Sequence, residues 1–128
     1  MCIRDSLSNV EAEVRRATYV LTSSSTTVHS SVNKAFDMNA FSERMNKAHI
    51  LHLTCHGQQH KDALSSCFEL NPPLTISTLM TLELPNAMLA YLSACETAKG
   101  DKSQPDQAVH LAASMLFCGF RSVVATMW

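Results

Sequence analysis

Several sequence signals are absent from this chain, and each absence removes a class of protein. No apolar stretch approaches the roughly 20 residues that span a bilayer, and the N-terminus lacks the apolar core of a secretory signal. Lys and Arg total 10 against 11 Asp and Glu, so the net charge is −1 and no basic stripe can neutralise a phosphate backbone. No CxxC pair and no internal repeat is visible. We therefore expect no membrane or nucleic-acid partner and no solenoid.

The composition that is present fits one globular domain. Of the 128 residues, 46% are hydrophobic and 16% are charged, which supplies enough apolar material for a single core. The cysteine count is odd, and a chain of this size needs no disulfides to fold, so a reducing, cytoplasmic location is expected. Most of these thiols are expected to be small buried hydrophobes. The cysteines are Cys2, Cys55, Cys67, Cys95 and Cys118.

Hydrophobic patterning predicts alternating strands and helices. The run 87–94 is almost continuously apolar, which is typical of a central strand buried on both faces by helices. Alternation of strand, helix and strand, with right-handed crossovers, predicts an α/β fold with three layers around a mostly parallel central sheet. We predict strands at residues 17–22, 49–54, 67–70, 87–94 and 121–127.

Two helices are predicted between these strands. In residues 39–47, Phe41 and Met45 are four apart, with Asn39 or Ser42 as the N-cap. The second helix precedes Gly119, a C-cap candidate, and its core-facing positions are expected to be Val109, Ala112, Ala113 and Leu116.

Two predicted strands are each followed by a residue suited to covalent catalysis. His56 follows the strand 49–54, and Cys95 follows the strand 87–94. If the two strands are parallel neighbours, both side chains leave the carboxyl edge of one sheet, where open α/β folds bind their ligands. The pair therefore predicts a Cys-His dyad at this edge.

Three segments, 49–57, 92–100 and 119–128, resemble the CHAT domain, a caspase-like cysteine peptidase domain often joined to tetratricopeptide repeats. The segments read HILHLTCHG, LSACETAKG and GFRSVVATMW. The resemblance implies that His56 is the catalytic histidine and Cys95 the nucleophile, whereas 121–128 is structural. It also implies a polypeptide substrate, regulatory segments such as tetratricopeptide repeats in a larger intracellular protein, and no cofactor. Relatives continue past Trp128, so we expect residues 17–128 to be a partial, C-terminally truncated domain and 1–16 an N-terminal segment that need not be a native start.

Cysteine peptidase chemistry gives these residues physical roles. A nearby imidazole favours the thiolate that attacks the carbonyl and returns the proton to the leaving amine. Two backbone N–H groups stabilise the oxyanion, and we assign them to Gly57 and Cys95. Glycine after the histidine lets the substrate approach without meeting a Cβ.

Two other functions remain open from the sequence. The same fold can be a catalytically silent signalling or scaffold module that mediates protein–protein interactions. A histidine tract next to Cys55 also allows a metal-binding module, although a strand at 49–54 turns its members to different sides, so no metal ligand is assigned. The tract consists of His49, His52, His56 and His60.

Overall fold

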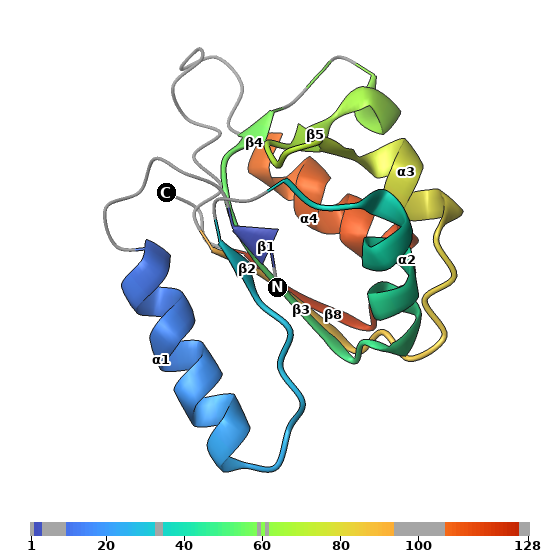
Figure 1. Cartoon of the computed structure of the whole chain (residues 1–128). Helices are drawn as coiled ribbons and strands as arrows, with labels where there is room; N and C mark the ends of the chain where they lie inside the picture. The colour runs from blue at the N-terminus through green and yellow to red at the C-terminus, as the bar shows by residue number, and fades with distance from the viewer. Residues whose placement is uncertain are drawn as a thin grey trace.

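The computed structural model describes residues 2–3, 10–32, 35–58, 60, 62–93 and 107–125. Its main sheet has the strand order β2-β1-β3-β7-β8, and every neighbouring pair is parallel. Figure 1 shows these strands running side by side through the centre of the molecule. The strands are β1 (Cys2–Ile3), β2 (Ser31–Val32), β3 (Ile50–Thr54), β7 (Leu89–Ser93) and β8 (Ser122–Ala125).

A small antiparallel sheet continues from the end of β3. Its strand order is β4-β5-β6, and α3 (Ile76–Thr81) follows it directly. The short 3-10 helix η1 (Ala63–Ser65) lies in the connection between β4 and β5. The strands are β4 (Gly57–Gln58), β5 (Cys67–Phe68) and β6 (Leu74–Thr75).

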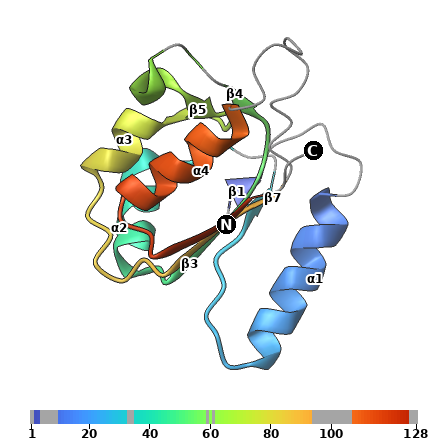
Figure 2. The same cartoon turned by 180° about the vertical axis from the view of Figure 1, so that it is seen from behind.

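Helices lie on both faces of the parallel sheet. Figures 1 and 2 show α1 (Val10–Ser23) on one face, and α2 (Met38–Lys47) and α4 (Gln107–Phe117) on the other. The predicted mixed α/β class with a parallel sheet is therefore confirmed. Strands β3, β5, β7 and β8 fall within four of the predicted segments.

The core lies between the sheet and the layer of α2 and α4. Leu51 and Leu53 of β3 and Ala90 and Leu92 of β7 are each at most 1% exposed, because alternate residues of a strand point to the same face. The opposite face of β7 is more open, since Tyr91 is 36% exposed. The expectation that this strand is buried on both faces was therefore wrong.

Helix α2 agrees with the prediction except at its cap. Phe41 and Met45 are both buried, as their spacing indicated. The N-cap is Asp37, whose side chain accepts a hydrogen bond from the backbone N–H of Asn39. Neither Asn39 nor Ser42 caps the helix, since the helix already begins at Met38.

Helix α4 was predicted in the right place with the wrong face toward the core. Leu111 and Met115 are at most 1% exposed, whereas Leu116 is 50% exposed. Apolar residues lie almost all the way around this helix, so their spacing alone does not select a face. After the helix, Gly119 adopts a φ of 111°, the left-handed region expected for a glycine C-cap.

The strand predicted at residues 17–22 was wrong, because these residues belong to α1. Val14 is buried, and Ala17, Thr18 and Leu21 are half-buried, which is the spacing of one helical face. Thr and Val favour strands in isolation, but this preference is weak, and tertiary contacts such as that of Glu13 with His52 outweigh it. Among the described residues, none of the helices combines the length and apolarity that crossing a membrane requires.

Candidate active site

Strands β3 and β7 are parallel neighbours in register, as the catalytic hypothesis required. Ile50 pairs with Leu89 at one end, and Thr54 pairs with Ser93 at the other. The carboxyl ends of both strands therefore meet at the same edge of the sheet. His56 is two residues beyond Thr54, whereas Cys95, two residues beyond Ser93 in the sequence, lies outside the described residues.

The backbone of His56 is held by the small antiparallel sheet. Its carbonyl accepts a 2.8 Å hydrogen bond from the N–H of Glu69, at the point where the chain passes from β3 into β4. The side chain of His56 is partly exposed, so it can contact both solvent and a bound ligand. The small sheet thus fixes the backbone of His56 and leaves its imidazole partly exposed.

The same hydrogen bond sets the direction of the Gly57 N–H. Gly57 pairs with Phe68, so His56 and Glu69 are the next directly opposite pair. Hydrogen-bonded and non-hydrogen-bonded pairs alternate along an antiparallel ladder. Because Glu69 donates to His56, the pair of Gly57 and Phe68 is the non-hydrogen-bonded one. The N–H of Gly57 therefore points away from β5, on the outer side of β4.

The chain after β4 is tied back to the small sheet through Ser66. The Ser66 Oγ accepts a hydrogen bond from the backbone N–H of His60 at 3.1 Å, and its carbonyl accepts one from Ile76 at 2.9 Å. Ser66 is only 4% exposed, and these contacts give its hydroxyl oxygen and its carbonyl hydrogen-bond partners in that environment. The segment that follows His56 is thereby anchored at both ends.

Three thiols have the buried positions expected of core cysteines. Cys55, Cys67 and Cys118 are all buried, and none of these three forms a disulfide. Burial raises the pKa of the Cys118 thiol. Burial and, to a lesser extent, the nearby carboxylate of Glu69 raise the pKa of the Cys67 thiol. Since the thiolate is the reactive form, Cys67 and Cys118 are poor nucleophiles at neutral pH.

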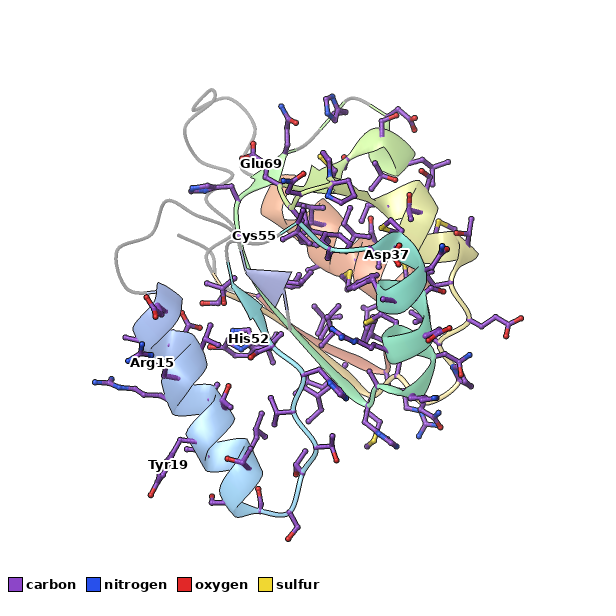
Figure 3. The ribbon with its side chains drawn as sticks, viewed as in Figure 1. Arg15, Tyr19, Asp37, His52, Cys55 and Glu69 are labelled. Carbon is purple, nitrogen blue, oxygen red and sulfur yellow. The ribbon has the colours of Figure 1, made fainter. Side chains whose placement is uncertain are left out.

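His52 faces away from this edge, toward α1 (Figure 3). Its Nε2 lies 3.1 Å from the Glu13 carboxylate and 3.1 Å from the Thr54 hydroxyl, and its ring meets Tyr91 edge-on at 4.9 Å. A carboxylate only accepts hydrogen bonds, so Nε2 carries the proton. Burial lowers the pKa of His52, and the attraction of Glu13 opposes this only in part. His52 therefore links α1 to the sheet and takes no part in the candidate dyad.

The histidine tract does not converge on one point. His49 immediately precedes β3, whereas His52 lies within the strand and is already paired with Glu13. Within the described part of the chain, no three His, Cys, Asp or Glu side chains are grouped so that they could hold a metal ion.

Sequence reasoning missed two contacts at and near the site, those of Glu13 and Glu69. Both partners are distant in the sequence from the histidines that they contact. No local pattern marks such residues, because they become neighbours only when the helix docks and the small sheet pairs.

Comparison with known proteins gives one family. The model of the CHAT domain matches residues 3–128. No curated protein matches the chain.

Proposed function

Because the chain belongs to the CHAT domain family, which is part of the caspase-like peptidase clan, we propose that it is a cysteine endopeptidase domain with Cys95 as nucleophile and His56 as general base. We likewise propose that the helices on both sides of the sheet form the three layers of a caspase-like sandwich. The peptidase would hydrolyse peptide bonds in a polypeptide substrate.

The observation that carries this proposal is the register of β3 and β7. Thr54 and Ser93 are directly paired, and each candidate residue follows its strand end by two positions. Two residues of chain extend at most about 7 Å, and neighbouring strands are roughly 5 Å apart. Short excursions of both segments toward each other are therefore enough to bring the thiol and the imidazole into contact.

The chemistry follows from this arrangement. His56 takes the thiol proton of Cys95, and the thiolate sulfur attacks the carbonyl carbon of the substrate. The tetrahedral intermediate then collapses as His56 donates the proton to the leaving amine, which leaves an acyl-enzyme thioester. Water, deprotonated by His56, hydrolyses the thioester and restores the thiol.

Gly57 supports the same proposal through its backbone. An oxyanion needs N–H donors that are not used in the surrounding sheet. The pairing of β4 with β5 turns the Gly57 N–H outward, away from its partner strand. We propose that the N–H groups of Gly57 and Cys95 hold the oxyanion.

The domain is proposed to act within a larger regulated protein. Proteins that contain this domain can carry tetratricopeptide repeats, which would bind partners and control access to the dyad. If the dyad does not react, the alternative is a signalling or scaffold module that uses the same fold without turnover.

The test is the alkylation rate of each cysteine by iodoacetamide between pH 5 and about 9, followed by mass spectrometry. The buried Cys67 and Cys118 are internal references. Near pH 7 an unperturbed thiol is only a few per cent thiolate, so Cys95 should react about tenfold faster than such a thiol when His56 stabilises the thiolate. The variants are His56→Ala and, as matched control, His49→Ala, since His49 is exposed at the opposite end of β3.

Fast Cys95 labelling that is lost in His56→Ala and kept in His49→Ala supports the peptidase and justifies a screen of peptide substrates. Cys95 labelling that is slow, or equally fast in both variants, overturns the dyad and favours the scaffold module.

A further inference from the structure

Glu69 is the last residue of the ladder that holds His56. Its N–H donates to the carbonyl of His56, and directly after it the N–H of Leu70 bonds to the carbonyl of Phe68 at 2.8 Å, a tight turn that ends β5. Glu69 is thereby fixed opposite His56 by its backbone. Figure 3 shows it beside the chain that runs from β3 into β4.

The pair two positions further along the ladder shows on which face these side chains lie. Gln58 is directly opposite Cys67, and the Cys67 thiol lies 3.8 Å from the Gln58 side-chain oxygen. Residues two positions apart on a strand share a face, so His56 and Glu69 have the same cross-strand relation as Gln58 and Cys67. The effect of the Glu69 carboxylate on the Cys67 thiol agrees with their lying on one face.

The distances suit a charged partner for an imidazole. Directly opposite residues of an antiparallel pair have Cβ atoms about 4.5–5.5 Å apart, well within the reach of a glutamate side chain. Glu69 is half-buried, so its carboxylate is less screened by water than that of a fully exposed residue.

We propose that Glu69 is a positioning residue, whose carboxylate orients the His56 imidazole and stabilises the imidazolium formed when His56 takes the proton of Cys95. This inference rests on the proposed peptidase function and extends its dyad to an ordered set of Cys95, His56 and Glu69. In this set the carboxylate accepts a hydrogen bond from one ring nitrogen of His56. The other ring nitrogen then faces Cys95 in the form that can accept its proton.

The test compares Glu69→Gln with the conservative Glu69→Asp and with Glu83→Gln as a control. Glu83 is exposed in the connection between α3 and β7, so the control removes the same charge away from the site. None of the three substitutions removes the backbone hydrogen bond from residue 69 to His56. Two readouts are taken on the full chain. They are the ring ¹⁵N chemical shifts of His56, which report the protonated nitrogen, and the ratio of Cys95 alkylation at pH 6 to that at about pH 9.

We expect one His56 tautomer in the unmodified chain and a mixture in Glu69→Gln. The alkylation ratio should fall about tenfold in Glu69→Gln, recover in part in Glu69→Asp and stay unchanged in Glu83→Gln. An unchanged tautomer and an unchanged ratio in Glu69→Gln overturn the role of Glu69, even when Cys95 is reactive and depends on His56. If Cys95 does not react but the tautomer responds to Glu69→Gln, the pairing with His56 stands and the peptidase proposal fails.

Discussion

Replacing Phe68 by Ala should destabilise the domain far more than the same change at Phe117. Phe68 is 1% exposed at the centre of the core, in the strand that pairs with β4, whereas Phe117 is 82% exposed at the end of α4. Truncating a buried phenylalanine costs about 3–5 kcal/mol, because transfer free energy is lost and a cavity remains. An exposed substitution changes stability by less than about 0.5 kcal/mol.

The measurement is urea unfolding followed by circular dichroism. With a slope of about 2 kcal/mol per M, a loss of 4 kcal/mol lowers the midpoint by about 2 M for Phe68→Ala. The midpoint for Phe117→Ala should move by less than about 0.3 M. Since domains of this size are stable by only about 5–15 kcal/mol, the Phe68→Ala variant is expected to be close to unfolding at 37 °C.

The substitution should also reach the candidate site. Phe68 precedes Glu69, so loosening of β5 should weaken the hydrogen bond from Glu69 to His56. Amide hydrogen exchange of Glu69 should accelerate in Phe68→Ala and not in Phe117→Ala. Equal midpoint shifts in the two variants, or a loss below about 1 kcal/mol in Phe68→Ala, would refute the packing argument.

Three further predictions follow from particular side chains. Burial lowers the pKa of His52 below its ordinary 6.5, so the unfolded chain binds the extra proton first and stability should fall as the pH drops below 6.5. In a thermal-unfolding pH series, His52→Gln should flatten the loss of stability below pH 6.5, and an unaltered slope would contradict the lowered pKa of His52. Asp37→Ala removes the acceptor for the N–H of Asn39 and should lower the free energy of unfolding in urea by about 0.5–2 kcal/mol. Asp37→Asn keeps an acceptor and should retain most of the stability. Gly119→Ala should lower the free energy of unfolding by about 1 kcal/mol or more, because the φ of 111° is strained for alanine. A Cβ at this position would meet only ordinary van der Waals contact, so a stabilised variant would show that the turn relaxes.

The sequence by itself determined the elements whose signal is local. The continuous apolar run in β7, the spacing of Phe41 and Met45 in α2, and the glycine after α4 each predicted an element that the structure contains. The family resemblance also came from short segments, and the match to the CHAT domain confirms it, whereas the pairing of His56 with Cys95 stays a prediction. These features were predictable because a strand, a helical face or a motif is encoded within about ten consecutive residues.

Tertiary structure decided which face of each element is buried. Helix α1 was missed because its Thr and Val content favours a strand, although Val14 and Leu21 have helical spacing. Its docking against His52 through Glu13 is a contact between distant parts of the chain. In α4 the apolar residues surround the helix, so only packing selected Leu111 and Met115 for the core.

The register at the candidate site was decided in the same way. Sequence predicted two strands that end near His56 and Cys95, but pairing of Thr54 with Ser93 exists only in the folded sheet. The position of Glu69 opposite His56 depends on the ladder between β4 and β5, which the sequence did not indicate. Strand pairing joins residues that are far apart along the chain, and a one-residue slip would exchange the two faces, so local pattern cannot fix it.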